Sequence, residues 1–393
     1  MRLPTQLRPG GQRPRLVTPS FRHSHPPKLG AWPAGGRIGG SHEEEGGETV
    51  HRNVIVVGAS AGGVEALRRL MSGLPADLAA CVLVVLHVAP YGGSVLPAIL
   101  SRSGPLPARH PAHQQPLTEA SVWVAPPDHH LAVSGSQILL TRGARENGVR
   151  PAVDVLFRSA ARAQGERVIG VVLSGVLDDG TAGLSAVAAR GGVTVVQDPR
   201  DALYPGMPSS AIEHVAVDHV VPIADMAQLL VRLCEEEVVE KQLPVSPSMA
   251  VETDTALMDD DAMNLSDRPG RPSGFSCPDC SGVLWEIQDG QLLRYRCRVG
   301  HAWSAESLLG EQTGQLDTAL WMALRGLEEK AALARTLEQR AVERGSPLTA
   351  GRFAEQGKDA SHAASLIRSM LEAHLGTPDE DPLLDDITAG RPA

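Results

Sequence analysis

Three short apolar runs of this chain each end in a residue that can take part in catalysis, and they constrain the fold more than any other feature. Residues 54–57 lead into a glycine-rich turn with Ser60, residues 81–86 lead into His87, and residues 168–173 lead into a loop with Asp179. Short β-branched runs separated by helical patterns are typical of a parallel sheet. The carboxyl ends of parallel strands lie along one edge, where such folds bind ligands. We therefore expect these side chains to share that edge, as a Ser–His–Asp hydrolase requires.

The composition indicates a protein without membrane spans or a disulfide framework. The 393-residue chain has room for two or three domains, and its formal net charge of −10 argues against non-specific binding of nucleic acid. No apolar run reaches the roughly 18 residues of a membrane span, and the N-terminus lacks the apolar region of a secretory signal. Three of the five cysteines cluster with a histidine, which indicates a metal site in a reducing compartment. The expected localisation is cytoplasmic.

Changes in composition divide the chain into segments. Residues 1–50 are rich in Pro, Gly and Arg, and we expect them to be disordered. Alternatively they are not translated, because residues 43–48 could be encoded by a purine-rich ribosome-binding site ahead of a GTG start at Val50. Residues 51–235 alternate strand and helix patterns, 236–274 are an acidic linker, 275–310 hold the cysteine cluster, 311–375 are helical, and 376–393 are a disordered tail.

The pattern over residues 51–235 predicts a doubly wound α/β domain with a mostly parallel sheet, followed by a small zinc-ribbon-like module and C-terminal helices. Helices are expected after Ser60 and at 153–163, 181–189 and 223–234, and further on at about 313–344 and 349–374. Strands are expected at 54–57, 81–88, 122–124, 138–140, 168–173 and 193–197.

The turn that carries Ser60 fits either a nucleophile or a bound anion. Its glycines let the backbone pass sharply from strand to helix, and the free N–H groups of a helix N-terminus favour an oxyanion. A serine needs a base to take its proton, and His87 could do so if an aspartate orients the ring. Such turns more often hold a phosphate or cofactor, but Ser60 stands where a dinucleotide-binding turn has its second glycine. The order Ser60, His87, Asp179 also differs from the serine–acid–histidine order of α/β-hydrolases.

Residues 53–235 resemble the catalytic domain of the bacterial chemotaxis protein-glutamate methylesterases, the CheB type. The resemblance implies Ser60 as nucleophile, His87 as general base and Asp179 as the residue that orients it, with Asp178 solvated. It also implies that the chain hydrolyses γ-glutamyl methyl esters on chemoreceptor helices and releases methanol. The matching segments, in order, are Val57-Gly58-Ala59-Ser60-Ala61-Gly62-Gly63, Leu86-His87-Val88, Val124-Ala125-Pro126-Pro127-Asp128-His129-His130, Arg150-Pro151-Ala152-Val153-Asp154-Val155-Leu156-Phe157, Leu173-Ser174-Gly175 through Asp179-Gly180, and Tyr204-Pro205-Gly206-Met207-Pro208.

The sequence departs from the family pattern in places. Ala61 follows the nucleophile where the family often has a hydroxyl residue, and Gly175-Val176-Leu177 stands where it often has Gly-Met-Gly. Backbone oxyanion donors, expected near Ala61 and Val176, survive both changes. A receiver domain normally precedes this catalytic domain, and residues 1–50 are too short to form one. We therefore expect the enzyme to be constitutively open, or its control to come from the C-terminal extension or another protein.

Cys277, Cys280, Cys297 and His301 form a four-ligand set with the spacing of a zinc ribbon. Two close-spaced pairs on turns supply the tetrahedral ligands that zinc prefers. Because the protein would fill every position, the predicted zinc is structural, and no cofactor is expected for catalysis. A CxxC pair also serves redox chemistry, but no thioredoxin-like context surrounds this one. The other cysteines, Cys81 and Cys234, are expected to be inert core residues.

The sequence leaves competing functions. The methylesterase site could also deamidate receptor glutamines. A second hypothesis is a non-catalytic signalling scaffold that keeps the esterase fold and acts through its ribbon and helices, and a third is phosphate or nucleotide binding at the Ser60 turn. The expected partner is the set of methylated chemoreceptor cytoplasmic helices, and it is open whether the chemotaxis methyltransferase is another. Neither nucleic acid nor membrane embedding is expected.

Overall fold

The computed structural model describes residues 49–91, 93–241, 243–259, 262, 270–289 and 292–375. The expectations for residues 1–48 and 376–393 lie outside these ranges. Thr49 and Val50, which were expected in the disordered segment, belong to strand β1 (Thr49–His51). This strand pairs antiparallel with β12 (Glu237–Val239).

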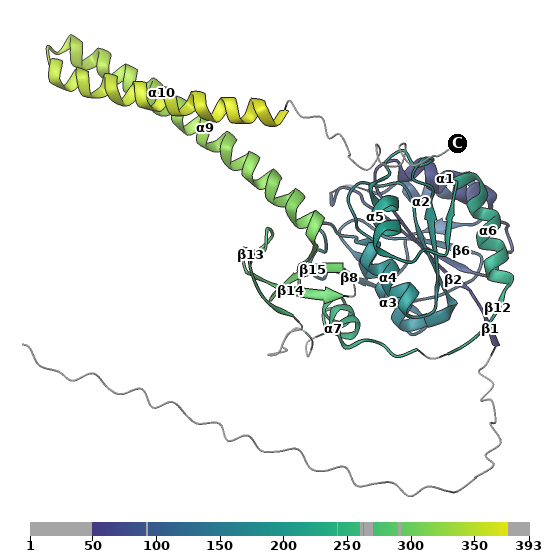
Figure 1. The fold of residues 1–393 in the computed structure, drawn as a ribbon. Helices are drawn as coiled ribbons and strands as arrows, with labels where there is room; N and C mark the ends of the chain where they lie inside the picture. The colour runs from purple at the N-terminus through teal and green to yellow at the C-terminus, as the bar shows by residue number, and fades with distance from the viewer. Residues whose placement is uncertain are drawn as a thin grey trace, which may run out of the picture. The chain divides into compact units, whose positions relative to one another are not determined.

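A parallel sheet forms the centre of the domain (Figure 1). In the described part of the chain its strand order is β11-β10-β9-β2-β3-β6-β4. The chain runs outward from β2 through β3 to β6, and then returns to the other side of β2 to lay down β9, β10 and β11. The point where the direction reverses is where doubly wound sheets bind their ligands. The predicted fold class is therefore confirmed. The strands are β2 (Val54–Ala59), β3 (Cys81–Leu86), β4 (Ala108–Arg109), β6 (Ser121–Val124), β9 (Val168–Val172), β10 (Val193–Gln197) and β11 (His219–Val221).

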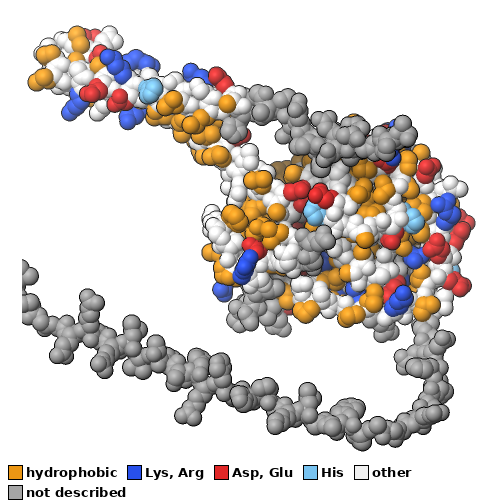
Figure 2. All heavy atoms as spheres, in the orientation of Figure 1, with side chains coloured by type: hydrophobic (Ala, Val, Ile, Leu, Met, Phe, Trp, Pro, Cys, Tyr) orange, Lys and Arg blue, Asp and Glu red, His pale blue; other side chains and the backbone are white. Residues whose placement is uncertain are grey.

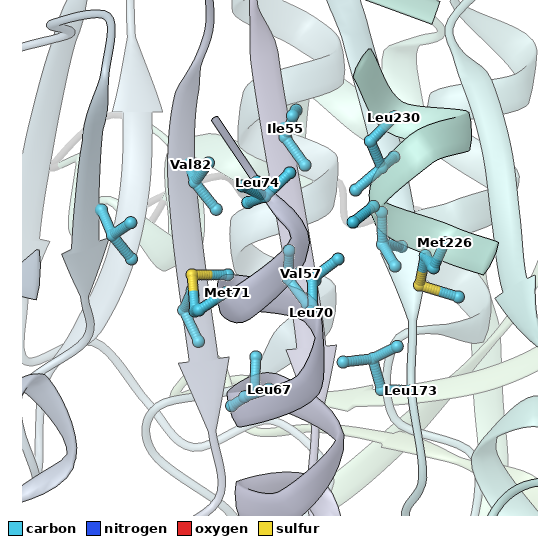
Figure 3. Close-up of a cluster of buried hydrophobic side chains, with 14 of the residues drawn as sticks. Ile55, Val57, Leu67, Leu70, Met71, Leu74, Val82, Leu173, Met226 and Leu230 are labelled. Carbon is cyan, nitrogen blue, oxygen red and sulfur yellow. The ribbon is translucent and has the colours of Figure 1, made fainter. Parts of the chain in front are cut away.

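Helices cover both faces of this sheet, because alternate residues of the buried strands point to opposite sides. On one face, Ile55 and Val57 pack with α1 (Gly63–Gly73), α2 (Leu96–Ser103) and α6 (Ile223–Glu235). Figure 3 shows α1 contributing Leu67, Leu70, Met71 and Leu74 to this core. On the other face, Val54 and Val56 pack with α3 (Val153–Gln164), α4 (Thr181–Ala189) and α5 (Gly206–His214).

The strand expected at 138–140 is confirmed as β8 (Gln137–Thr141), which lies in a separate antiparallel sheet with β7 (His130–Ser134) and β5 (Gln115–Pro116). One expectation for this region needs correction. The stretch 236–274, expected as a linker, contains β12 and a helix, α7 (Pro247–Ala256). The acidic character of that stretch was misleading because Glu252 of α7 is buried and pairs with Arg294, which lies far along the chain.

The C-terminal part begins with an antiparallel sheet of order β13-β14-β15-β16, as far as the structure describes it. Its strands are β13 (Arg271–Ser276), β14 (Val283–Asp289), β15 (Leu292–Cys297) and β16 (Ala302–Ser304). Helix α9 (Ala305–Glu343) follows directly and begins earlier than expected, because the Ser304 hydroxyl caps it by accepting a hydrogen bond from Ser307 N.

Helices α9 and α10 (Pro347–Leu375) pack along each other around Leu324, Ala364 and Leu371. Figure 2 shows hydrophobic side chains interspersed with charged ones on the visible face of this hairpin. Among the described residues, no helix combines the length and the apolar character needed to cross a bilayer.

Candidate active site and metal cluster

Ser60, His87 and Asp179 meet at the carboxyl edge of the central strands. Ser60 follows β2, His87 follows the neighbouring strand β3, and Asp179 lies in the loop between β9 and α4. The Ser60 hydroxyl lies 3.2 Å from His87 Nδ1, and His87 Nε2 lies 2.7 Å from Asp179 Oδ2. The structure thus brings together the three residues that the sequence singled out, in one continuous chain of hydrogen bonds.

The ionised carboxylate of Asp179 sets the direction of the hydrogen bonds that run from Ser60 through His87 to Asp179. An ionised aspartate only accepts hydrogen bonds, so the Nε2 of His87 must carry the proton that it donates to Asp179. In neutral imidazole the other nitrogen then carries a lone pair. Nδ1 of His87 therefore accepts the hydroxyl hydrogen of Ser60, which is the orientation that a general base needs.

Close backbone packing fixes the position of Ser60. Gly62 has a left-handed φ of 73°, and a Cβ there would lie 2.6 Å from Ser174 Oγ. A Cβ on Gly175 would lie 2.9 Å from Ser60 Cβ and 2.1 Å from Met207 Sδ. The Ser60 N–H donates to Ser174 O (3.0 Å), which ties the Ser60 turn to the end of β9. The glycines are therefore needed because two loops of the sheet edge pack directly on each other.

Asp179 is a buried carboxylate surrounded by donors. Besides His87, its Oδ2 accepts from Val153 N (2.7 Å), and its Oδ1 accepts from Asn147 Nδ2 (3.0 Å) and Asp154 N (3.2 Å). Burial by itself raises the pKa of Asp179, but His87 and these N–H groups outweigh it and hold the pKa below its usual value. The carboxylate therefore stays ionised and keeps the imidazole in one tautomer.

Asp154, like Asp179, accepts backbone hydrogen bonds at the N-terminus of a helix. Asp179 caps the first turn of α3, and Asp154, from that turn, caps α4 by accepting from Gly180 N (3.0 Å) and Gly183 N (2.7 Å). Burial, followed by the neighbouring Asp179 carboxylate, raises the pKa of Asp154. The two aspartates thus lock the N-termini of two helices to each other. Periodicity gives no signal for this pairing, and in the sequence analysis Asp154 stands only inside one of the segments that resemble the esterase family.

Asp178 is not solvated, contrary to the expectation. It is buried, and its Oδ1 accepts from Ser304 Oγ (2.8 Å) and Ser307 Oγ (2.7 Å) at the start of α9. Burial raises its pKa even though both hydroxyls donate to it. The expectation failed because it treated the loop as a free surface, whereas the C-terminal module covers it.

The N–H groups of Ala61 and Val176, expected as oxyanion donors, have no acceptor among the described residues. Val176 is also half-exposed. Neither N–H group is therefore engaged within the described part of the chain, and the role of both as oxyanion donors stays a prediction. Arg150, which lies in one of the matching segments, is bound to Asp128 through Nε (2.9 Å) and Nη2 (2.5 Å).

The structure also brings together Cys277, Cys280, Cys297 and His301, whose ligand atoms all lie within 4.8 Å of one another. The Sγ atoms of Cys280 and Cys297 are 3.6 Å apart, and His301 Nδ1 lies 3.5 Å from Cys297 Sγ and 3.7 Å from Cys277 Sγ. A tetrahedral zinc with ordinary bond lengths requires about 3.8 Å between sulfurs and about 3.5 Å between sulfur and nitrogen. The donor set therefore fits a zinc ion. Asp279 Oδ2 lies 3.9 Å from the other ring nitrogen of His301 and is placed to orient that ligand.

Cys81 and Cys234 lie in the core and have no part in this cluster. Both are buried, and burial raises the pKa of Cys81 to about 12 and that of Cys234 to about 11. Such thiols remain protonated at neutral pH and have the inert character that the sequence predicted.

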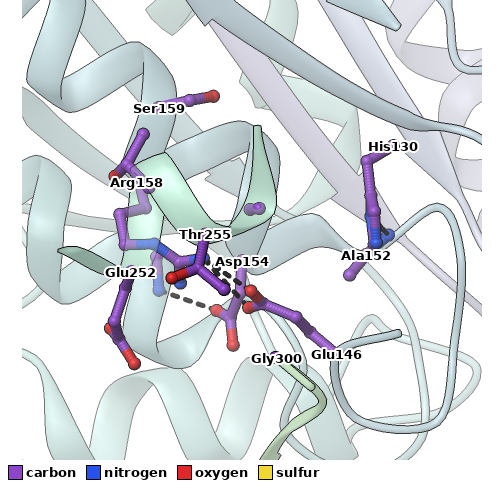
Figure 4. A network of polar contacts seen from close by, with 12 residues as sticks. His130, Glu146, Ala152, Asp154, Arg158, Ser159, Glu252, Thr255 and Gly300 are labelled. Carbon is purple, nitrogen blue, oxygen red and sulfur yellow. Dashed lines mark hydrogen bonds and ion pairs between the residues drawn. The ribbon is translucent and has the colours of Figure 1, made fainter. Parts of the chain in front are cut away.

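A buried charge network joins the zinc-ribbon-like module formed by strands β13 to β16, called the ribbon below, to the α/β domain (Figure 4). Glu146 accepts from Arg158 Nη2 of α3 (2.8 and 3.0 Å) and from Arg296 Nη2 of β15 (2.9 Å). Glu252 of α7 accepts from Arg294 Nη1 of β15 (2.5 Å). Burial raises the pKa of Glu146, but the guanidinium groups around it outweigh burial and hold the pKa far below its usual range. The ribbon is thus bound through ionised groups that have little contact with water.

Replacing Glu146 with glutamine is expected to destabilise this interface at pH 7 by about 3–5 kcal/mol, because it leaves buried arginines without a counter-charge. The folded-state pKa of Glu146 is depressed. Its contribution is therefore present above the pKa of the unfolded chain, about 4.3, and is lost as the pH falls through the folded-state pKa. Urea titrations followed by tryptophan fluorescence at pH 7 and at about pH 3 measure both effects, and Glu146→Gln should lose less stability on acidification than the parent.

The matched control is Glu286→Gln, which removes a ribbon glutamate paired with Arg271 at the surface. An exposed pair of this kind contributes at most about 1 kcal/mol. Equal effects of the two substitutions would contradict the proposed importance of the buried network.

The fold and the site define a class of protein: a doubly wound α/β domain with a Ser–His–Asp arrangement of the serine-hydrolase kind at the carboxyl edge of its sheet. The family model for CheB methylesterase matches residues 55–230. A putative protein-glutamate methylesterase/protein-glutamine glutaminase of Leptospira interrogans is 34% identical over 180 residues, which cover 46% of this chain and 93% of the relative. The chain belongs to the CheB methylesterase family, a family of carboxylic ester hydrolases.

One further relative and one solved structure are similar to parts of this chain. A protein-glutamate methylesterase/protein-glutamine glutaminase of Methanosarcina mazei is 34% identical over 194 residues, which cover 47% of this chain and 53% of the relative. The chain thus spans about half the length of this relative and of several others. The crystal structure of the Thermotoga maritima CheB methylesterase catalytic domain matches with a TM-score of 0.45 and 30% identity, over 47% of this chain and 100% of that one.

Proposed function

We propose that this chain hydrolyses glutamyl methyl esters on the cytoplasmic helices of chemoreceptors and releases methanol. The observation that carries the proposal is the hydrogen-bonded series from Ser60 through His87 to Asp179. A scaffold that had lost its activity would have no reason to keep a buried carboxylate aligned on a histidine beside a serine. Intact geometry therefore supports the enzyme over the non-catalytic alternative.

In the first half of the reaction, Ser60 Oγ attacks the ester carbonyl carbon while His87 Nδ1 takes the hydroxyl proton. Asp179 stabilises the imidazolium that forms. The free N–H groups of Ala61 and Val176 are the proposed donors to the oxyanion, and the loss of one such donor typically costs about 3 kcal/mol of transition-state stabilisation. The intermediate collapses as His87 gives the proton to the departing methoxide, which leaves as methanol. The product is a glutamyl ester of Ser60.

Water then completes the cycle by the same groups. His87 takes a proton from the water that attacks the acyl carbon, and afterwards it returns the proton to Ser60 Oγ as the carbon–oxygen bond breaks. The products are a free γ-carboxylate on the substrate and the original serine. No step draws on a metal or an organic cofactor.

The surroundings of Ser60 suit a protein surface rather than a small molecule. A hollow of about 260 Å³ beside the site is lined mainly by apolar side chains, among them Val64, Leu86 and Val88. Large hydrophobic side chains also stand exposed around the site: Tyr91, Val95, Val176, Leu177, Leu203 and Tyr204. An apolar rim of this kind marks a docking surface for a partner, and the side of a receptor helix that carries the methylated glutamate would supply the complementary face.

A second activity is proposed at the same site. The relatives from Leptospira interrogans and Methanosarcina mazei are both named as glutaminases as well as methylesterases. Deamidation of a receptor glutamine follows the same steps, with ammonia in place of methanol as the leaving group.

The Cys277/Cys280/Cys297/His301 cluster is proposed to hold a structural zinc ion. When bound, zinc would cross-link the two turns of the ribbon and leave no open position for a substrate. Purified protein is expected to contain about one zinc per chain, and Cys297→Ser should lose it and lower the melting temperature of the ribbon. Metal analysis and thermal melts check this, with Cys234→Ala as the control that retains zinc. A parent chain free of zinc after growth in zinc-supplemented medium would contradict the assignment.

The experiment that tests the proposed function is methanol release from methylated chemoreceptor by the purified chain, beside Ser60→Ala. Release by the parent but not by the variant supports the proposal. If neither releases methanol and a fluorophosphonate probe does not react with Ser60, the scaffold reading replaces it. Stabilisation by nucleotide would instead point to an anion-binding turn.

A further inference from the structure

The segment that follows the histidine of the metal cluster lies directly against a loop of the active site. Asn147 N donates to Ala302 O (2.8 Å), and Ala302 N donates to Arg145 O (3.2 Å). Trp303 is buried, and a Cβ on Gly148 would lie 3.2 Å from its ring. Strand β16 therefore continues from His301 into a backbone pairing with residues 145–148 of the α/β domain.

Asn147 connects this pairing to the catalytic aspartate. Its Oδ1 accepts from Ser304 N (2.9 Å), so its amide nitrogen must face the other way. That nitrogen donates to Asp179 Oδ1 (3.0 Å) and to Asp154 Oδ2 (3.2 Å). One amide group thus spans the ribbon and the carboxylate that orients His87.

The same segment also reaches the residue before the catalytic aspartate. Ser304 Oγ and Ser307 Oγ both donate to Asp178 Oδ1. Residues 302–307 therefore contact the Asp179 loop at two points, one through the Asn147 side chain and one through Asp178. A displacement of this segment would move both contacts together.

We propose that Asn147 is a positioning residue that couples the metal cluster of the ribbon to the alignment of Asp179. With a metal ion on Cys277, Cys280, Cys297 and His301, the turn before β16 is fixed, and Asn147 is held against Asp179. Without the ion, the turn and β16 lose their constraint, and Asp179 loses a donor that keeps it facing His87. This inference rests on the proposed function and adds a way in which the Ser60 site is regulated.

The competing account is that the ribbon only stabilises the domain. The charged contacts of Glu146 and Glu252 with β15 would then hold it in place whether or not a metal is bound. That account predicts no effect of the metal on the reactivity of Ser60 while the chain remains folded.

The test uses the full-length chain and measures the rate at which a fluorophosphonate probe labels Ser60, with zinc content and thermal melting followed on the same samples. Chelation of zinc is expected to slow labelling about tenfold to hundredfold, the range for losing a hydrogen bond to a charged group, and added zinc should restore the rate. On methylated receptor, kcat should fall by the same factor while KM stays unchanged.

Asn147 has a left-handed φ of 53°, so glycine is the replacement that removes the side chain without backbone strain. Asn147→Gly is expected to keep its zinc, to label slowly, and to respond less to chelation than the parent, because only the contact of Ser304 and Ser307 with Asp178 remains. Asn147→Asp keeps an acceptor for Ser304 N but puts a carboxylate where Asp179 had a donor, and it should be at least as slow. This pair separates the coupling from a general loss of folding, because the ribbon still holds its metal.

Labelling that is unchanged by chelation and by Asn147→Gly overturns the coupling and leaves the proposed function intact. If Ser60 of the zinc-loaded parent is not labelled and no methanol is released, the proposed function fails and the coupling fails with it.

Discussion

Ser60→Ala should lose methylesterase activity by a factor of about 10⁵ to 10⁶ in kcat. Removal of the nucleophile from a serine triad has an effect of this size because the rest of the triad acts only through it. The hydroxyl is the group that lies 3.2 Å from His87 Nδ1, and alanine fits the same turn without disturbing Gly62 or Gly175. We expect receptor binding to be retained, so that kcat falls and the dissociation constant does not. Methanol release and receptor pull-down at equal protein concentration measure the two effects.

Ser72→Ala is the matched control, since Ser72 lies on the exposed side of α1 and bonds only to Arg69 O among the described residues. It should keep the activity of the parent. Residual activity of Ser60→Ala within a hundredfold of the parent would show that another group is the nucleophile.

Asp179→Asn should lower kcat by about 10⁴, which corresponds to about 5.4 kcal/mol of transition-state stabilisation. An amide has one acceptor oxygen, whereas both carboxylate oxygens of Asp179 accept hydrogen bonds. Oδ2 accepts from His87 and Val153, and Oδ1 accepts from Asn147 and Asp154. If the amide nitrogen faces His87, the ring must present a lone pair there, and Nδ1 then carries the proton and cannot accept one from Ser60. If it faces the other way, the N–H groups of Asn147 and Asp154 lose their acceptor.

Either orientation also costs stability, because each buried donor without an acceptor costs about 1–3 kcal/mol. The fraction folded must therefore be measured by circular dichroism alongside the kinetics. Asp198→Asn is the control, since Asp198 follows β10 at the same edge of the sheet and pairs with Arg200. Asp198→Asn should stay within a few-fold of the parent. A folded Asp179→Asn protein with near-parent kcat would refute the assignment of the triad.

The α/β fold could be predicted because its signals are local. The runs at β2, β3 and β9 are buried on both faces and therefore read as continuous apolar segments. The bounds of α4 and β10 agree with the residues expected for them. Strand β7 was missed although its pairing partner β8 was expected, because the apolar run that follows His130 is short. Helix α7 was missed because the counter-charges of Glu252 lie on β15, which no local pattern can reveal.

The sequence could predict those residues of the site that follow the ends of strands. Ser60, His87 and Asp179 have side chains suited to acid–base chemistry, and the structure brings them together as expected, while their catalytic roles stay a prediction. The cysteine spacing predicted a metal site, and the structure brings its four donors together. Asn147 and Asp178 could not be assigned in this way. Their roles depend on residues 302–307 folding back onto the catalytic loop, more than a hundred residues along the chain. Sequence patterns describe the elements of a site, but not the contacts that join two modules.

The most direct test of the account is to treat the zinc-loaded full-length chain with a fluorophosphonate probe and map the adduct by mass spectrometry. It needs no cognate receptor and asks whether Ser60 is an activated nucleophile. The account predicts an adduct on the peptide that contains Ser60, absent from Ser60→Ala and strongly reduced in His87→Ala. An unmodified Ser60, with the probe absent from the chain or attached to another serine, would contradict it.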